Sequence, residues 1–440
     1  MKHILTFAPL FLTAISYTAD ADSLTEIYDL AKTNDPMLLK AAAQKESAFE
    51  AINSSRSLLL PQIDLTAGYA YQDSDRHTMD GSSSNVSLGL SQSIYDRSSW
   101  IALTISEKNA RASDARNAAI QQATIYKVTK AYFDVLKAED NLMFVQAEKE
   151  AVAKQLAQTE QRFSVGVAPI TDVHDARAQF DSVIAQEIQA KNSVENEYEE
   201  LRAITGHPAS HLSTLDTERF STALPVTTAD ELVYKASNDN LRLLASRIEK
   251  DIAKEQISLA QSGHLPTIAL TTDYRYSKNH NEPSNPITGA ALDNDQNQFN
   301  LGVSIDLPVY SGGRVTSEAK QAEYQYVAAS QDLESNFRDV QKEVRALNNN
   351  IRSSIGSITA YTQSVVSAKS ALTATQEGFN VGTRTIVDVL ESTQNVYQAN
   401  RNLADARYQY ILSQVQLKQA VGSLSEQDIL DISAGLTSKK

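Results

Sequence analysis

An internal duplication constrains the fold of this chain more than any other feature of its sequence. The segment 162–166 (Arg-Phe-Ser-Val-Gly) returns as 378–382 (Gly-Phe-Asn-Val-Gly), and 170–173 (Ile-Thr-Asp-Val) returns as 386–389 (Ile-Val-Asp-Val), both 216 positions later. Other matches keep the same order in each half, so one structural unit is built twice. The duplication divides the chain into a first repeat at 22–228, a second repeat at 229–422 and a C-terminal tail at 423–440.

The N-terminal residues have the pattern of a secretory signal peptide. Lys2 precedes an apolar run from Ile4 to Ile15, and small residues follow up to Ala21. This order predicts a signal at 1–21, with a buried N-terminal helix as the alternative. The run is shorter than the roughly 20 apolar residues that span a bilayer, and no later segment supplies them. We therefore expect an exported chain that enters a membrane, if at all, through β-strands.

Each repeat begins with a predicted helix, at 23–57 or 229–263, which ends before a proline. Proline lacks an N–H and keeps the preceding residue extended, so helical bonding stops there. Strict alternation of apolar and polar residues then predicts two strands in each repeat. They are expected at 62–73, 85–95, 267–277 and 298–309.

The predicted strands are about 10–12 residues long, close to the length of a tilted membrane-spanning strand, and carry tyrosines where an aromatic girdle would lie. The alternative is a soluble antiparallel sheet with one face in water. A closed barrel needs at least about eight strands. Four strands therefore require several copies of the chain.

Long tracts rich in Ala, Gln and Ser predict helices over 98–163 and 314–378. Their apolar residues recur every three to four positions, and at about 1.5 Å per residue each helix spans roughly 100 Å. Each ends at a tip turn and returns as a helix at 171–205 or 385–421. A short opening helix and a return helix together match one long helix, which indicates paired coiled coils in a long cylinder.

Composition and motifs exclude several other functions. A net charge of −14 disfavours a nucleic-acid partner, and the absence of cysteine excludes disulfides and thiolate metal sites. His207 and His211 are four residues apart, but Pro208 breaks the helix that would align them as ligands. No nucleophile, base and orienting group share a recognisable motif. We expect no enzyme, no metal and no cofactor.

The repeated motifs carry a resemblance to a known family. The run 379–391 (Phe-Asn-Val-Gly-Thr-Arg-Thr-Ile-Val-Asp-Val-Leu-Glu), the segments 162–166 and 170–173, and the tail motif at 420–428 resemble the TolC family of outer-membrane efflux and secretion channels. The resemblance covers essentially the whole mature chain. It implies a mixed, mainly α fold: a homotrimer whose strands form one twelve-stranded transmembrane β-barrel, continuous with a periplasmic α-helical coiled-coil tunnel.

The resemblance also implies a function and partners. The chain would be the passive exit duct of tripartite multidrug efflux pumps and type I secretion systems. It would lie in the outer membrane of a Gram-negative bacterium, in contact with lipid, with most of its residues in the periplasm. Its partners would be a periplasmic adaptor (membrane fusion) protein and an inner-membrane RND-type pump or ABC exporter, whose engagement opens the helical tip.

Two acidic residues near the second turn are candidates for an aperture. Asp388 and Glu391 are three positions apart, so on a helix they share a face. The resemblance implies that in a trimer they form acidic rings that favour cations and respond to pH. Asp172 and Asp175 hold corresponding positions in the first repeat. The alternative is that acids in a first helical turn complement the helix dipole, with Thr385 and Asp388 forming a cap.

The resemblance further implies a gate tether composed of Arg384, Thr171, Asp172 and Asp175. Arg384 would bond across to Thr171 and Asp172, because a guanidinium can hold a hydroxyl and a carboxylate together. The alternative is a solvated surface arginine. Two residues depart from the family pattern. Phe379 replaces a tyrosine whose hydroxyl joins this network, and Glu391 replaces an aspartate, which keeps the charge.

The turns also resemble the adaptor-docking notches of the family. Val165 and Gly166 in the first turn, and Val381 and Gly382 in the second, are the residues concerned. The glycines alternatively serve only to permit a tight turn, and both roles are compatible. From the residues without the resemblance, an exported coiled-coil filament or adhesin and a secreted envelope enzyme stay open as other functions.

Overall fold

The computed structural model describes residues 22–73, 81–223, 227–280 and 295–437, so the predicted signal peptide lies outside the described residues. The chain forms two compact units, and each contains residues of both sequence repeats. Of the described residues, the first unit contains 22–36, 122–223, 227–229 and 344–437, and the second contains 37–73, 81–121, 230–280 and 295–343.

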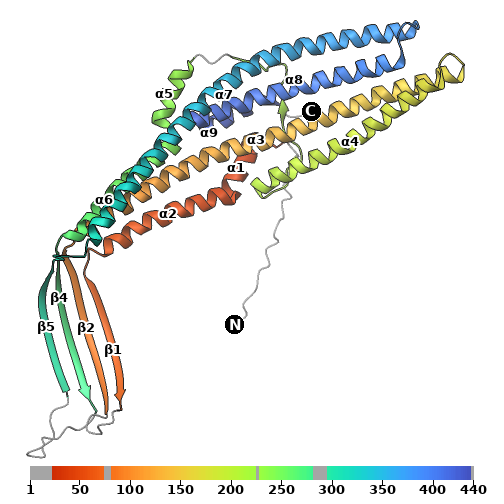
Figure 1. The fold of residues 1–440 in the computed structure, drawn as a ribbon. Helices are drawn as coiled ribbons and strands as arrows, with labels where there is room; N and C mark the ends of the chain where they lie inside the picture. The colour runs from red at the N-terminus through yellow and green to blue at the C-terminus, as the bar shows by residue number, and fades with distance from the viewer. Residues whose placement is uncertain (1–21, 74–80, 224–226, 281–294, 438–440) are drawn as a thin grey trace, which may run out of the picture. The chain divides into compact units, whose positions relative to one another are not determined.

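The second unit contains an antiparallel sheet in the strand order β1-β2-β4-β5 (Figure 1). The strands are β1 (Gln62–Gln72), β2 (Gly81–Tyr95), β4 (Thr267–Asn279) and β5 (Asp295–Asp306). β2 begins four residues before its predicted start because a run of serines pairs with the far end of β1. β5 ends three residues before its predicted end, since Pro308 has no N–H for a ladder.

One face of this sheet is apolar across all four strands. Leu65 pairs with Leu88, Leu88 with Tyr274, and Tyr274 with Phe299, so apolar side chains form a row perpendicular to the strands. The row is exposed: Leu65 is 72% and Phe299 is 65% accessible. Exposed apolar rows of this extent indicate a surface that is covered by something outside the chain.

The helix that opens each repeat is interrupted, which corrects the continuous helices predicted at 23–57 and 229–263. In the first repeat, α1 (Leu24–Asn34) and α2 (Pro36–Ser57) are separated at Asp35, which is extended because a proline follows it. In the second repeat, α5 (Ala229–Asp239) and α6 (Leu241–Gln261) are separated at Asn240. The Asn240 side chain accepts the N–H of Leu243 at 3.0 Å and caps α6.

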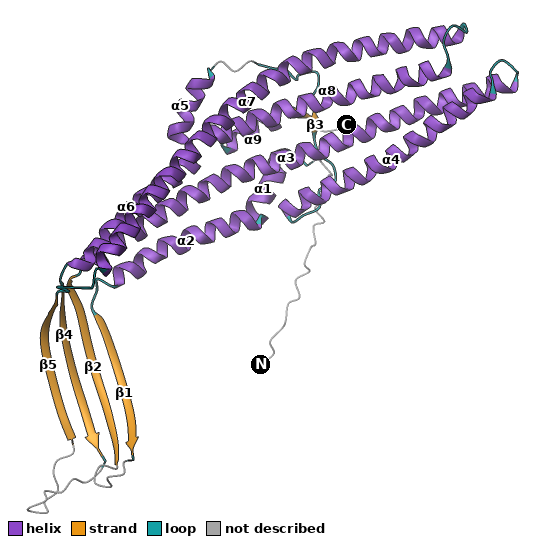
Figure 2. Cartoon of the chain, viewed as in Figure 1, coloured by secondary structure: helices purple, strands orange, loops and turns teal. Residues whose placement is uncertain are grey.

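Long helices follow the strands in both repeats, and each is paired with a shorter return helix (Figure 2). Hairpin 1 consists of α3 (Arg97–Ser164) and α4 (Ile170–Thr205), and hairpin 2 consists of α7 (Arg314–Asn380) and α8 (Ile386–Val421). Both return helices end at a left-handed glycine, which satisfies the last carbonyls. Among the described residues, none of the helices has both the length and the apolar character to cross a membrane.

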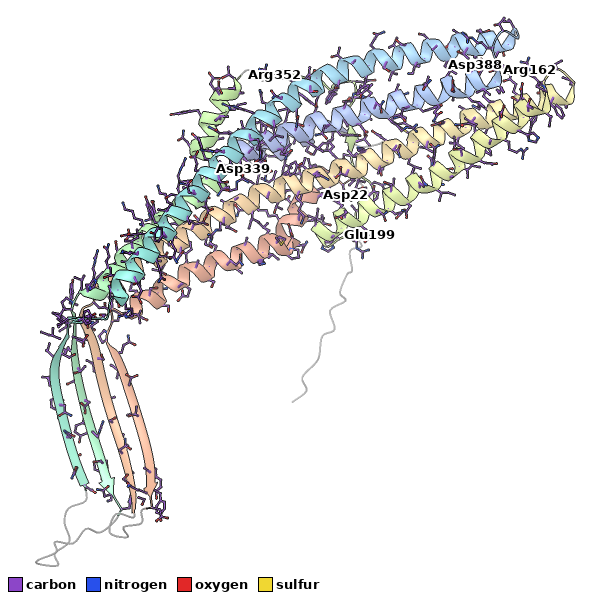
Figure 3. All side chains as sticks on the ribbon, in the orientation of Figure 1. Asp22, Arg162, Glu199, Asp339, Arg352 and Asp388 are labelled. Atoms are coloured by element: carbon purple, nitrogen blue, oxygen red, sulfur yellow. The ribbon has the colours of Figure 1, made fainter. Side chains whose placement is uncertain are left out.

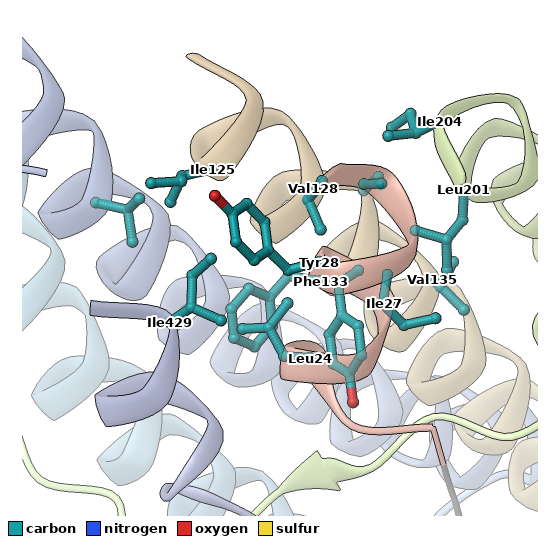
Figure 4. Close-up of a cluster of buried hydrophobic side chains, with 14 of the residues drawn as sticks. Leu24, Ile27, Tyr28, Ile125, Val128, Phe133, Val135, Leu201, Ile204 and Ile429 are labelled. Atoms are coloured by element: carbon teal, nitrogen blue, oxygen red, sulfur yellow. The ribbon is translucent and has the colours of Figure 1, made fainter. Parts of the chain in front are cut away.

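The apolar core of the first unit lies where α1 meets α3, α4 and α8 (Figure 4). Leu24 and Ile27 of α1 pack there against Val128 and Tyr132 of α3. Tyr132 is fully buried, and its hydroxyl donates to the carbonyl of Ser213 at 2.8 Å. Because a buried hydroxyl without a partner is costly, this bond fixes the ring in the core.

The C-terminal tail, which the sequence left without predicted elements, is folded against this core. It forms α9 (Glu426–Ser433) and β6 (Leu436–Thr437), and β6 pairs with β3 (Thr214–Leu215). Glu426 binds Lys32 at 2.6 Å and accepts a hydrogen bond from Tyr28 at 3.2 Å. The tail therefore holds α1 in place.

Candidate functional site

The turn of hairpin 1 presents the first copy of the repeated motif. Gly166 has a φ of +80°, a left-handed conformation that glycine adopts without strain. Its N–H donates to the carbonyl of Phe163, and the N–H of Val167 donates to that of Arg162, both at 2.9 Å. These two bonds close the end of α3. They also leave Val165 and Val167 more than 60% exposed, at 68% and 63%.

The turn of hairpin 2 repeats this geometry. Gly382 has a φ of +83° and donates to the carbonyl of Phe379 at 3.1 Å, while Thr383 donates to that of Gly378 at 2.8 Å. The spacing of donors and acceptors equals that of the first turn. Val381 is 75% exposed. The four predicted docking residues thus occupy equivalent, exposed positions at the ends of the two hairpins.

Asp388 forms the cap that the sequence offered as the alternative to an aperture. The Thr385 hydroxyl accepts the N–H of Asp388 at 3.2 Å, and the Asp388 carboxylate accepts the N–H of Thr385 at 2.8 Å. The hydrogen bond from the Thr385 backbone is the main reason that the pKa of Asp388 lies below its usual range, with smaller help from the Thr385 hydroxyl and Arg384. Glu391 is exposed on the next turn of α8. Figure 3 shows Asp388 near the start of α8.

The residues of the predicted tether are not joined within one chain. Arg384 is exposed and folds back over Gly378, where an added Cβ would lie only 2.7 Å from the Arg384 Cγ. Thr171 and Asp175 are exposed at the start of α4, and Asp172 is half-buried. Within the described part of a single chain, no hydrogen bond or ion pair links Arg384 to any of these three residues.

The structure brings together one pair that sequence reasoning missed. The guanidinium carbon of Arg162, at the end of hairpin 1, lies 4.6 Å from the ring centroid of Phe379 in hairpin 2. Phe379 is only 4% exposed and belongs to an apolar cluster shared by the two hairpins. The family resemblance concerned only the hydroxyl that Phe379 lacks. The available signal was the motif alignment itself, since Arg162 and Gly378 hold the same position before a phenylalanine.

Deeper between the hairpins, α3 and α8 share a buried ion pair. Arg401 binds Glu148 at 3.3 Å, with side chains 15% and 1% exposed. Burial raises the pKa of Glu148 and Arg401 partly offsets that effect. Nearby, the Tyr397 hydroxyl donates to the carbonyl of Ala147 at 3.0 Å. A cavity of about 500 Å³ adjoins the pair, and its charged lining residues are Lys137, Asp140, Arg401 and Asp405.

These polar groups do not form a metal site. Across the described ranges, no group of three His, Asp or Glu side chains gathers in a way that could hold a metal ion. The cavity lining combines two cations with two carboxylates, and amides supply much of the rest. The arrangement is suited to joining helices in water and offers no nucleophile beside a base.

Similarity to known proteins identifies the class of protein, an outer-membrane efflux channel. The family model described as "Outer membrane efflux protein" matches residues 27–207 and 232–423. The chain belongs to this family, whose members are channels and not enzymes. The predicted family and the predicted outer-membrane location are therefore confirmed. Membership also decides against the filament, adhesin and envelope-enzyme alternatives.

Particular relatives are similar over nearly the full length. The chain is 53% identical over 440 residues to outer membrane protein TolC of Vibrio cholerae, covering 99% of each chain. It is 44% identical to outer membrane protein TolC of Escherichia coli, covering 97% of this chain and 88% of that one. The solved CmeC outer membrane channel of Campylobacter jejuni has the same fold, with a TM-score of 0.79 at 20% identity, covering 94% of this chain and 89% of that one.

Proposed function

We propose that the chain is the passive exit duct of tripartite multidrug efflux pumps and type I secretion systems, and that it works as a homotrimer. Three copies would join their strands into one twelve-stranded transmembrane barrel, and their hairpins into a periplasmic tunnel. The observation that best supports this assembly is the sheet. β1 and β5 each have one neighbour within the described chain, so two long edges need strands from other copies. The exposed apolar row across the sheet suits contact with lipid.

The proposed partners are a periplasmic adaptor (membrane fusion) protein and an inner-membrane RND-type pump or ABC exporter. The adaptor would dock on Val165 and Gly166 of hairpin 1 and on Val381 and Gly382 of hairpin 2. Exposed valines beside rigid glycine turns give a partner apolar contacts at fixed positions. A relative in Pseudomonas aeruginosa, 27% identical over 449 residues and spanning 97% of this chain and 90% of its own length, is named alkaline protease secretion protein AprF. That name supports the type I secretion role.

The proposed closed state combines the tether with the acidic ring. Arg384 forms no such bond within the described part of one chain, so its bonds with Thr171 and Asp172 would join neighbouring copies. Asp388 and Glu391 would line the narrow end of the tunnel. The cap on Asp388 supports this role, because a carboxylate whose pKa is lowered stays ionised near neutral pH. Rings of ionised carboxylates favour cations and bind multivalent ones.

Planar-bilayer conductance of the detergent-purified protein tests the proposed function. We expect heat-resistant trimers and cation-selective channels of low conductance that a trivalent cation blocks. The Asp388→Ala/Glu391→Ala variant should lose the block. The matched control is Glu195→Ala/Glu199→Ala, which removes two exposed carboxylates of α4 and should keep it. Folded protein that forms no channels would overturn the duct, and an unchanged block in the first variant would overturn the acidic ring.

A further inference from the structure

We propose that Arg162 and Phe379 form a latch between the two hairpins of one chain, and that this latch opposes opening of the tip. The inference rests on the proposed function, since a latch needs a channel to close. It gives Phe379 a role of its own in the gate, in place of the hydroxyl bond that the resemblance implied. The contact is a cation–π interaction, in which a guanidinium lies over the negative face of an aromatic ring.

The geometry of the pair suits a strong contact of this kind. The separation of 4.6 Å between guanidinium carbon and ring centroid is well within the reach of about 6 Å over which such pairs attract. Phe379 packs in the shared apolar cluster with Ile386 and Val389 of α8 and with Val152 of α3. The ring is therefore shielded from water, and a cation–π contact is stronger where water is excluded.

Among the described residues, the charge of Arg162 has no competing carboxylate partner. Within the described part of the chain, its guanidinium makes no ion pair or hydrogen bond with a carboxylate. The nearby Arg177, in contrast, binds Glu160 at 2.5 Å and so joins α4 to α3 inside hairpin 1. Arg162 is thus free to interact with the ring of the other hairpin. Figure 3 shows it near the end of α3.

The pair lies close to the tip, where the two hairpins would separate on opening. Farther from the tip, Gln155 of hairpin 1 bonds Gln376 of hairpin 2 at 2.7 Å. The Arg162–Phe379 pair lies about one to two helical turns closer to the tip. Any opening that separates the ends of the two hairpins must break this pair. A device of this kind makes the tip two-state, since the cation either covers the ring or is released to water.

The difference between the two repeats supports the same assignment. The position of Arg162 is occupied by Gly378 in the second repeat, and Arg384 folds into the space that Gly378 leaves. An arginine at 378 would collide with Arg384. The first repeat therefore supplies the cation and the second supplies the buried ring. The reverse pairing cannot form, because Gly378 has no side chain to lie over Phe163.

A double-mutant cycle on channel conductance tests the latch. Arg162→Gln and Phe379→Leu should each raise the ratio of open to closed tips by about 2- to 30-fold, the range that such contacts supply. The double variant should open no further than the stronger single variant, because both remove the same contact. Phe379→Tyr keeps the aromatic face and should conduct like the wild type.

Two controls separate the latch from local packing. Phe163→Leu alters the equivalent, 42% exposed ring of hairpin 1, and Arg177→Gln removes a nearby surface cation. Both should conduct like the wild type. Wild-type conductance in Arg162→Gln, or effects that add in the double variant, would overturn the latch. In that case the channel would still conduct, and the trivalent cation would still block it through Asp388 and Glu391. A wild type without channels would instead overturn the proposed function.

Discussion

Gly378, which has no side chain, determines where Arg384 lies at the tip. Gly378 lies inside α7, where glycine lowers helix stability relative to alanine, and its lack of a Cβ is what lets Arg384 fold over the helix. Gly378→Ala should therefore displace Arg384 and raise channel conductance, although alanine is the better helix former. Single-channel recording measures this effect.

The control for this prediction is the other glycine of the α7 interior. A Cβ at Gly356 would meet nothing within 4 Å. Gly356→Ala should stabilise the protein by about 0.5–1 kcal/mol and leave conductance unchanged. Equal conductance in Gly378→Ala and the wild type would show that the position of Arg384 does not matter to the closed tip.

At the scale of elements, the buried Glu148–Arg401 pair joins α3 and α8. The loss of stability caused by breaking this pair should depend on pH. Arg401→Met leaves Glu148 buried without its cation and should destabilise the folded chain by about 3 kcal/mol. Burial raises the Glu148 pKa above its ordinary value of 4.5, so folding favours the protonated form. The contribution of Glu148 to the stability of the folded chain is therefore largest at low pH and is lost as pH rises through the raised pKa. Arg401→Met should be least harmful near pH 4 and most harmful near pH 8, as denaturant unfolding followed by circular dichroism can show.

The matched control is a solvent-exposed cation that also joins α3 to α8. Lys137 binds Asp405 at 3.3 Å, and both side chains are about half exposed, at 52% and 49%. Lys137→Met should change the unfolding free energy by less than about 1 kcal/mol at either pH. A loss in Arg401→Met that does not vary with pH would contradict the assignment of the penalty to the Glu148 charge.

At the scale of the whole molecule, the proposed assembly of copies depends on the four-stranded sheet. Leu301 lies two residues after Phe299 on the same apolar face of β5 and is 67% exposed, so in the proposed barrel it would face lipid. Leu301→Arg should cost about 2–4 kcal/mol per chain, because lipid solvates a guanidinium poorly. The share of heat-resistant trimers recovered from membranes should fall accordingly.

Ser304 provides the matched position, since it lies on the same strand and on the opposite face. Ser304→Arg should leave trimer recovery near that of the wild type and shift ion selectivity toward anions, as expected for a water-filled interior. Equal losses of trimer in both variants would contradict the assignment of the two faces.

Local patterns predicted the elements well where a single segment determines the outcome. The strands follow from alternation, the hairpin turns from glycines, and the Thr385–Asp388 cap from a spacing of three residues. The break at Asp35 was also readable, because a proline follows it. The break at Asn240 was less so, since asparagine caps a helix only in one of several local conformations.

The duplicated order of helices and strands, the two tip turns and the resemblance to an outer-membrane channel family can all be read from the sequence. All of these depend on neighbouring residues or on repeated motifs. Three contacts emerged only from the tertiary structure: Arg162 lies over Phe379, Arg401 meets Glu148, and Glu426 of the tail binds Lys32 of α1. Such contacts join residues more than 200 positions apart. No local pattern specifies them, because they depend on how helices far apart in the sequence pack against each other.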